Sequence, residues 1–391
     1  MLRDQVIAAI DVGTTKVCTV LGQLGASGRV EVVGVGIAPS RGLRKGVVVN
    51  IEEAVDAIAE SIERAERSSG YEIASAIVGI AGSHVESMNN HGVVAVAGAD
   101  RMITVDDVNR AMESARTVNV PSNRDLLHVI ARSYRVDEQE GVRNPIGMHG
   151  FRLEVQAHIV TAAATSVQNL TRCIERLDVE VDDLVLEPIA SAEAVLTDEE
   201  KEMGVVLADI GGGTTDVAIF VDGSIWHSCV LPVGGYHLTN DLAIGLRAPF
   251  AIAEQLKVGS GHALPLGIDP DEMVEIAGFG GEARRTVSRQ AIASIIEARV
   301  EEILGMISLE IQRCGQEGLL PAGLVLTGGT ARLKGIEVLA SELIGLPVRV
   351  GLPVGLTGLL DSINSPDYAT SLGLLLWGLR HGELTEPMTP A

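Results

Sequence analysis

Two short stretches of this sequence combine carboxylates, glycines and hydroxyls in a pattern suited to phosphate chemistry. In the longer one an apolar run ends at Asp209, a glycine-threonine turn follows, and Asp216 leads into a second apolar run. Glycine lets the backbone approach a ligand closely, and successive N–H groups with hydroxyls can cradle phosphate oxygens. The flanking carboxylates suit Mg²⁺ held through water. A glycine-rich hairpin without a ligand also fits this stretch alone. The residues of the turn are Gly211, Gly212, Gly213, Thr214 and Thr215.

The same order of residues occurs near the N-terminus. There a strand-like run ends at Asp11, and a second turn leads into another apolar run. Both copies continue into a third strand, at 30–38 and at 224–231. A repeat of a whole three-stranded unit predicts two like-folded halves that face each other. The residues of this turn are Gly13, Thr14, Thr15 and Lys16.

Composition limits the kind of molecule. The 391 residues, 46% hydrophobic and 21% charged, predict a folded chain of roughly two to three domains. Only 3% are aromatic, so the core must consist mainly of Val, Ile, Leu and Ala. A net charge of −22 disfavours nucleic acid and anionic membrane surfaces as unassisted partners. It does not disfavour a nucleotide, because backbone N–H groups, Mg²⁺ and a lysine supply positive charge locally.

Neither a signal peptide nor a membrane span is recognisable in the sequence. Asp11 interrupts the first apolar run too early for a signal peptide, and no run reaches about 18 apolar residues. The cysteines lack metal-ligand spacing, which predicts free thiols in a reducing compartment. We therefore expect a soluble, cytoplasmic protein. The cysteines are Cys18, Cys173, Cys229 and Cys314.

Residues 83–160 have no counterpart in the second half and are predicted to form an inserted β-α-β-β subdomain. We expect a strand pair around 84–98, then a helix that begins at Thr104 with Asp107 in the reciprocal capping position. Further strands are expected at 126–136 and 152–160, with a polar loop between them.

A helix of small residues begins at Glu187-Pro188, just before the second repeat. Small side chains would let two helices cross closely where the halves meet, although an ordinary alanine-rich helix has the same composition. Glu187 is placed to orient a water molecule at a phosphate.

The second half contributes three further candidates. Pro249 opens a helix in which Glu254 and Lys257 share one face, as ligand contacts or as a solvated ion pair. After a loop-like stretch at 259–280, a long amphipathic helix spans about 288–312 and carries Arg289 and Arg299. A third glycine turn joins a strand to a helix and suits a phosphate or ribose edge. Its residues are Gly328, Gly329 and Thr330.

Taken in order, these motifs resemble those of the actin and DnaK-type ATPase superfamily over the whole chain. Within it, Ser40-Arg41-Gly42, the loop at 144–154 and the insert at 83–160 resemble the bacterial cell-division family FtsA. The resemblance implies an α/β, actin-like (ribonuclease H-like) fold: duplicated domains around a nucleotide cleft, with the inserted subdomain.

The resemblance also implies ATP with Mg²⁺ in that cleft. Asp11 and Asp209 would hold the metal through water, and the two glycine-threonine turns, with Asp216, would hold the phosphates. The turn at Gly328 to Thr330, with Glu254 and Lys257, would hold the adenosine. Glu187 matches the water-orienting carboxylate of hydrolysing relatives. Hydrolysis in the family is slow, so we expect an ATP-binding polymer rather than a metabolic catalyst.

The expected domain boundaries follow from the same resemblance. The first half comprises 1–82 and 161–200 with a closing helix at 365–381, and the insert comprises 83–160. The second half comprises 201–235 and 322–364, with a subdomain at 236–321 and a polar tail at 382–391.

The implied partners are further copies of the chain, other division proteins through the insert, and the C-terminal peptide of the tubulin-like FtsZ. Arg289 and Arg299 are the candidate residues for the peptide. The family is expected at the inner face of the cell membrane at the division site. Its members normally end in a basic amphipathic helix, whereas residues 382–391 contain two prolines, two glutamates and no Lys or Arg. We expect this tail not to be such an anchor.

Two alternatives remain at this point. A PilM-type pilus-assembly scaffold shares the fold and the insert but has no anchor helix. A sugar or acid kinase would also begin with Asp-x-Gly-Thr-Thr. Such an enzyme usually has an aspartate general base near the cleft, and no segment of this sequence indicates one.

Overall fold

The chain folds around two mixed β-sheets, each of which begins with the three-stranded unit repeated in the sequence. The computed structural model describes residues 6–25, 29–98, 100–117, 120–278, 284–315 and 317–381, so the predicted tail at 382–391 lies outside the described residues. The first sheet has the order β11-β6-β1-β2-β3-β19 and the second has the order β14-β13-β12-β17-β18. In both, an antiparallel hairpin is followed by a parallel neighbour.

The strands of the first sheet are β1 (Val6–Val12), β2 (Lys16–Leu24), β3 (Val30–Pro39), β6 (Ser75–Ile80), β11 (Glu180–Leu186) and β19 (Leu356–Gly358). Those of the second are β12 (Val205–Ile210), β13 (Thr215–Val221), β14 (Ser224–Leu231), β17 (Leu324–Thr327) and β18 (Val348–Val350). The central strands are buried along their whole length, because helices cover both faces of each sheet. The short pair β4 (Leu43–Arg44) and β5 (Val47–Val48) lies in the loop after β3.

The helices cover these sheets with apolar faces. Helix α1 is capped by Asn50, whose side chain accepts a hydrogen bond from the Glu53 amide, and it ends at the left-handed Gly70. No helix among the described residues is long and apolar enough to cross a membrane. The helices are α1 (Ile51–Ser69), α2 (Val105–Arg116), α3 (Ala164–Glu175), α4 (Glu187–Val195), α5 (Asp198–Met203), α6 (Gly235–Gly245), α7 (Phe250–Ser260), α8 (Arg289–Cys314), α9 (Ile336–Ile344) and α10 (Ala369–His381).

The insert, which we define as the segment from β7 to β10, forms a separate four-stranded sheet of order β7-β10-β8-β9 with α2 packed on one face. Its strands are β7 (Glu86–Ala95), β8 (Arg124–Val136), β9 (Gln139–Val142) and β10 (Arg152–Ala163). The predicted strand pair at 84–98 is wrong, because β7 is one continuous strand paired with β10. Gly92 lies in the middle of β7 without ending the strand. Glycine is needed there because α2 packs directly on this residue, and a Cβ would clash with the Ala111 carbonyl. The predicted loop at 137–150 contains β9, which pairs only at the edge of the sheet.

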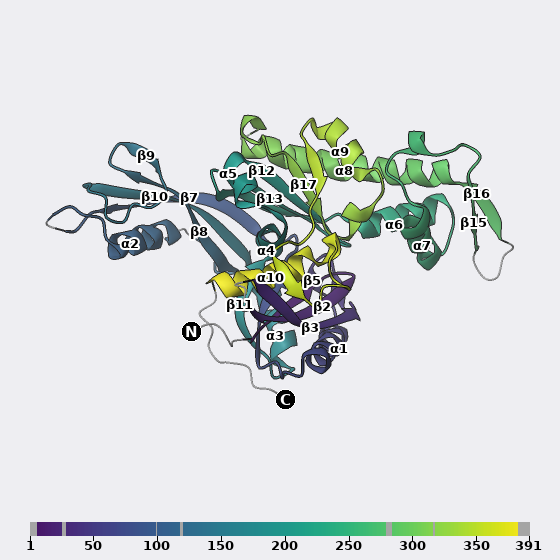
Figure 1. Ribbon diagram of the computed structural model, residues 1–391, viewed down its shortest axis with the longest axis horizontal. Helices are drawn as coiled ribbons and strands as arrows, with labels where there is room; N and C mark the ends of the chain where they lie inside the picture. Colours follow the sequence, from purple (N-terminus) through teal and green to yellow (C-terminus); the bar gives the residue numbers. More distant parts are fainter. Residues whose placement is uncertain are drawn as a thin grey trace.

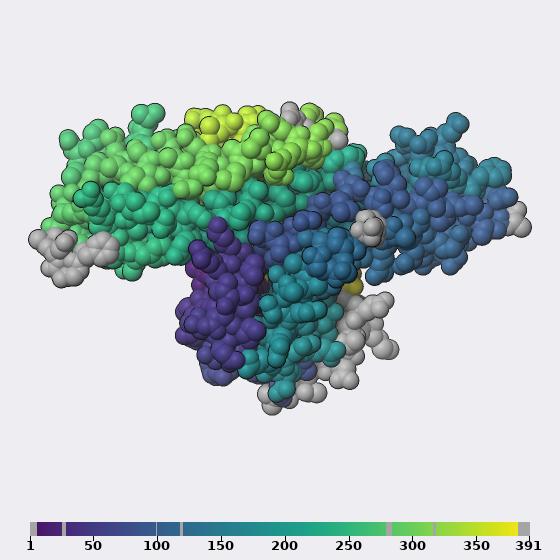
Figure 2. Space-filling view, turned by 180° about the vertical axis from the view of Figure 1, so that it is seen from behind, coloured from purple at the N-terminus to yellow at the C-terminus, as the bar shows by residue number. Residues whose placement is uncertain are grey.

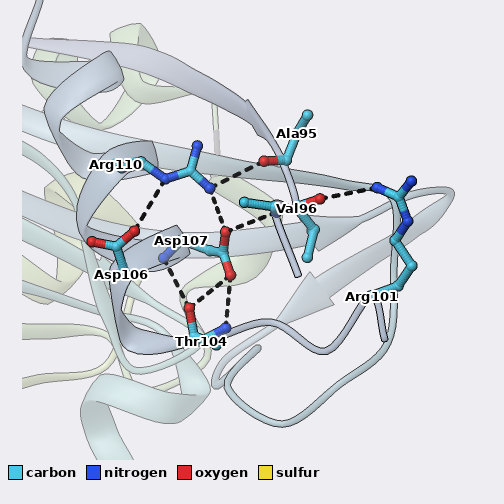
Figure 3. Close-up of polar contacts among 8 residues, drawn as sticks. Ala95, Val96, Arg101, Thr104, Asp106, Asp107 and Arg110 are labelled. Atoms are coloured by element: carbon cyan, nitrogen blue, oxygen red, sulfur yellow. Dashed lines mark hydrogen bonds and ion pairs between the residues drawn. The ribbon is translucent and has the colours of Figure 1, made fainter. Parts of the chain in front are cut away.

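Helix α2 is fixed to the insert by the predicted capping box (Figure 3). The Thr104 hydroxyl accepts from the Asp107 amide, and Asp107 accepts from the Thr104 amide and hydroxyl. Arg110 reaches from the next turn to Asp107 and to the Ala95 carbonyl of β7. Although burial opposes it, hydrogen bonds from Thr104, Ala97 and Arg110 lower the pKa of Asp107 to about 2. The carboxylate therefore ties the start of the helix to the end of the strand.

The insert lies at one end of the long axis, and helices α6 and α7 lie toward the other (Figure 1). Seen from behind, the second half and the insert form a continuous bar, and the first half projects below it (Figure 2). At the far end, β15 (Met273–Ile276) pairs with β16 (Arg285–Ser288) ahead of α8. The stretch predicted as a loop at 259–280 therefore contains a strand, β15, whose partner β16 lies beyond that stretch.

The base of the insert is hydrogen-bonded to the second half along β14. The Ser87 hydroxyl donates to the Ser228 carbonyl at 2.6 Å, and the Asn89 amide donates to the Trp226 carbonyl at 3.2 Å. On β10, His158 Nε2 lies 2.9 Å from the Ser228 hydroxyl. Burial lowers the pKa of His158 to about 3, so this ring is neutral at physiological pH.

Candidate functional site

The two halves enclose a cleft of about 250 Å³ that brings together residues from all three glycine turns. It adjoins a cavity of about 290 Å³ with which it shares Lys257, Val258, Gly329 and Thr330. The predicted residues that line the cleft are Asp11, Gly13, Thr14, Thr15, Lys16, Glu187, Asp209, Gly211, Gly212, Gly213, Thr214, Asp216, Glu254, Lys257, Gly328, Gly329 and Thr330.

The two phosphate-type turns face each other directly, and this contact requires glycine. A Cβ on Gly212 would clash with the Thr15 hydroxyl, and one on Gly213 would lie 2.6 Å from the Thr14 hydroxyl. The third turn closes on the second in the same way, since a Cβ on Gly328, which has a φ of +83°, would clash with the Asp209 carboxylate. Three segments far apart in the sequence therefore present backbone to one space.

Four carboxylates gather at the base of the cleft. Burial, together with the charge of Asp209, raises the pKa of Asp11 to about 6. Burial also raises the pKa of Asp209, and it raises the pKa values of Asp216 and Glu187 well above their ordinary range, with further contributions from the neighbouring aspartates. Buried like charges of this kind are relieved by a cation.

Hydroxyls from two crossing helices hold two of these carboxylates in place. Ser191 of α4 and Thr370 of α10 donate to Asp209 at 2.7 and 3.0 Å, and Ser371 donates to Asp11 at 2.8 Å. The predicted close crossing of α4 is confirmed: Gly373 of α10 lies against the Ala190 carbonyl, with no room for a Cβ. Nothing local in the sequence marks these hydroxyls, because single Ser and Thr residues in apolar helices carry no signal.

Lys16 is held at the rim of the cleft. Its Nζ lies 3.3 Å from Asp367 Oδ2 and 3.4 Å from the centre of the Tyr368 ring. Lys16 contributes, after the Ser365 hydroxyl, to the lowered pKa of Asp367, against the opposing effect of burial. Asp367 also lines the cleft but was not predicted, because it lies outside any glycine turn.

Glu254 and Lys257 line the adjoining end of the cleft. The Lys257 ammonium lies 2.8 Å from the Glu254 carboxylate, and it also donates to the Gly235 carbonyl and the Thr239 hydroxyl. The pair is therefore an ion pair that faces the cleft rather than solvent alone. Gly235, whose carbonyl accepts this bond from Lys257, is the first residue of helix α6 and also lines the cleft.

Three predicted residues lie away from the cleft walls. Thr215 is buried in β13, where its hydroxyl donates to the Val233 carbonyl. On α8, Arg289 pairs with Glu272 at 2.8 Å, and Arg299 pairs with Asp241 at 2.6 Å. Arg299 lines an open groove of about 430 Å³ with Asp241, Ser294, Ile295, Ala298 and Glu302. The two arginines therefore lie at different positions along α8 and pair with different acidic residues.

The residues of the cleft fit a magnesium nucleotide. Asp216 Oδ1 is buried without a hydrogen-bond partner, and the surrounding carboxylates offer only oxygen, the donor that Mg²⁺ prefers. The facing glycine turns present backbone N–H groups at the same place. If a nucleotide binds here, Asp11 and Asp209 are placed to hold its metal ion, and the turns are placed to hold its phosphates.

Comparison with protein families gives a consistent result. Residues 206–373 match the family described as Cell division protein FtsA, and residues 82–161 match the SHS2 domain inserted in FtsA. The chain is similar to Cell division protein FtsA of Pseudomonas aeruginosa, with 46% identity over 376 residues that cover 96% of this chain and 90% of that protein.

Solved structures share the fold at low sequence identity. The PilM-PilN type IV pilus biogenesis complex matches with a TM-score of 0.69 and 17% identity, covering 95% of this chain and 98% of the other. MreB5 of Spiroplasma citri bound to AMPPNP matches with a TM-score of 0.58 and 15% identity, covering 96% of both chains. These matches show the actin-like fold alone, so they do not favour a pilus scaffold. The sequence relatives and the inserted domain together place this chain in the FtsA family of cell division proteins.

Proposed function

We propose that this protein binds ATP with Mg²⁺ in the cleft between its halves and, in that state, assembles into actin-like filaments that link FtsZ to the division machinery. The observation that carries the proposal is the convergence of three glycine turns and four buried carboxylates on one cleft. Asp11 and Asp209 hold the metal ion through water. The turns beginning at Gly13 and Gly211 hold the phosphates, and the turn at Gly328 lies on the adenosine side with Glu254 and Lys257.

Glu187 is proposed to orient the water that attacks the terminal phosphate. It lines the cleft from the start of α4, and its pKa is raised by burial and by the nearby aspartates. The family resemblance implies that this hydrolysis is slow. We therefore propose a nucleotide-dependent structural protein with at most slow ATPase activity.

Two partner surfaces are proposed. Arg299, in the groove between α6 and α8, is the candidate contact for the FtsZ C-terminal peptide, together with Arg289 at the start of α8. The insert exposes apolar side chains suited to other division proteins: Met102, Val105, Ile146 and Phe151. We further propose that the protein acts at the cytoplasmic face of the membrane at the division site. The support for this is that its relatives are cell division proteins.

Direct nucleotide binding tests the central step. Titration with a fluorescent ATP analogue should show saturable binding that chelation of Mg²⁺ abolishes. Gly212→Ala places a methyl group against the Thr15 hydroxyl and should weaken binding by at least about tenfold, or 1.4 kcal/mol. Gly267→Ala, at a position with open space around it, should bind like the parent protein. Binding that needs no Mg²⁺ and is unchanged in Gly212→Ala would rule out this site.

A further inference from the structure

Strand β14 and helix α8 bring three side chains of different metal-ligand chemistry together, outside the nucleotide cleft. His227 and Cys229 are two apart on β14 and therefore point to the same side of the sheet. Between them, Ser228 points to the other side, where it meets His158 of the insert. Glu310 faces the pair from α8 and is only 6% exposed. The His227 nitrogen, the Cys229 sulfur and a Glu310 oxygen all lie within 4.8 Å of one another.

An ion pair accounts for only part of this arrangement. His227 Nε2 lies 3.0 Å from Glu310 Oε2, and Arg313 Nη1 lies 2.5 Å from Oε1 of the same carboxylate. His227 and Arg313 already occupy both oxygens of the carboxylate, yet the Cys229 sulfur also lies within 4.8 Å of a Glu310 oxygen. The three ligand atoms thus surround one point that a cation could occupy.

We propose that His227, Cys229 and Glu310 form a binding site for a divalent cation of the zinc class. Nitrogen, thiolate sulfur and carboxylate oxygen are the donors that zinc takes in proteins, and a thiolate discriminates against Mg²⁺ and Ca²⁺. Tetrahedral zinc with these bond lengths separates its ligand atoms by about 3.3 to 3.6 Å, so small side-chain adjustments suffice. This proposal does not depend on the nucleotide cleft, because none of the three residues lines that cleft.

Protons and charge balance when the cation enters. Cys229 loses its thiol proton to solvent, neutral His227 binds through Nε2 and carries its proton on Nδ1, and Glu310 binds as the carboxylate. One thiolate and one carboxylate then neutralise the two positive charges, while Arg313 stays on the outer oxygen of Glu310. The His227 side chain is 25% exposed, which leaves an entry path and a fourth position for water.

Cobalt substitution tests the site in the full-length protein. After chelator treatment, Co²⁺ should bind one to one and give a thiolate charge-transfer band with the visible spectrum of a tetrahedral site, and Zn²⁺ should displace it. Binding should release one proton per metal ion. Cys229→Ser should abolish the charge-transfer band, and His227→Gln should weaken zinc binding by more than about tenfold. The matched control is Cys314→Ser, which removes another partly exposed thiol one helical turn beyond Glu310 and should leave binding unchanged.

Two results would overturn the proposal. One is a folded wild-type protein, judged by circular dichroism, that shows no charge-transfer band with Co²⁺. The other is a band that survives in Cys229→Ser but disappears in Cys314→Ser. If Cys229→Ser fails to fold, the partly exposed His227→Gln decides the question, because an unchanged zinc affinity in that variant excludes His227 as a ligand.

Discussion

Individual carboxylates in the cleft are held at a cost to the stability of the empty protein. Asp11, Asp209, Asp216 and Glu187 are all stabilised in their neutral forms by burial and mutual repulsion. An acid whose pKa is higher in the folded state than in the unfolded state binds more protons when folded. Its contribution to stability therefore falls as pH rises from its unfolded pKa through its folded pKa. A bound Mg²⁺ would remove this penalty.

We predict that Asp11→Asn stabilises the protein in the absence of Mg²⁺ and nucleotide. The pKa of Asp11 moves from 3.8 to about 6 on folding, so ionisation destabilises the fold fully only above about pH 6. The gain in unfolding free energy should be about 3 kcal/mol at pH 7.5 and about half of that at pH 5. Denaturant titrations at the two pH values measure the difference.

The control for this prediction is the exposed Asp361→Asn, which should change stability little at either pH. In the presence of Mg-ATP the order should reverse, because the variant lacks a proposed metal contact and gains less from the ligand. A variant with the same stability gain at both pH values would contradict the assignment of the effect to Asp11 ionisation.

At the scale of elements, the crossing of α4 and α10 positions the cleft. Ser191, Thr370 and Ser371 hold the carboxylates only because these two helices approach closely. The approach depends on Gly373, where a Cβ has no room beside the Ala190 carbonyl. A helical glycine elsewhere carries no such requirement: Gly305 of α8 is exposed, with nothing within 4 Å of an added Cβ.

These two glycines give a matched pair of substitutions with opposite expected signs. Gly305→Ala should stabilise the protein by about 0.5 to 1 kcal/mol, because alanine is the better helix former. Gly373→Ala gains the same propensity but forces the helices apart, so it should destabilise by at least about 2 kcal/mol and weaken nucleotide binding. Thermal unfolding and ATP titration of both variants measure this. Equal effects of the two substitutions would show that the crossing does not set the geometry.

The elements that the sequence predicted are those with strong local signals. The repeated three-stranded units, the capped helix α2 and the long helix α8 follow from periodicity and capping residues. The edge strands β9 and β15 were missed because four residues are too few to show a clear alternating pattern. β9 pairs with the end of the preceding strand β8, and β15 pairs with β16. The same contrast holds in the cleft, where glycine turns predicted most of the wall but nothing local marked Asp367, Ser191 or Ser371.

At the scale of the whole molecule, helices α6 and α7 lie toward the opposite end of the long axis from the insert (Figure 1). The groove at Arg299 is lined by residues of α6 and α8. The chain carries a net charge of −22, so an acidic peptide meets long-range repulsion and needs a local cation. Arg299 is such a cation, oriented by Asp241 and Glu302 and only 23% exposed. An approaching carboxylate would compete with those two acids.

We predict that a labelled FtsZ C-terminal peptide binds the Mg-ATP form and that Arg299→Glu weakens binding by at least about tenfold. The charge reversal places three acids in one groove, so repulsion adds to the lost contact. Fluorescence anisotropy at two salt concentrations measures the affinity and its electrostatic part. Arg67→Glu, which reverses an exposed arginine on the first half, is the charge-matched control. Equal affinity in the two variants would remove the groove from consideration.

The hydrogen bonds between the insert and β14 fix the insert at its base, so a force on its outer end is transmitted to the second half. Ser87, Asn89 and His158 hold its base on β14, and β14 pairs along its length with β13, which begins two residues after Gly213. A load on the outer end cannot turn the insert against the second half without breaking these bonds or pulling β14 with it. If the proposed filament puts tension on the insert, that tension would be borne one strand away from the glycine turn of the cleft.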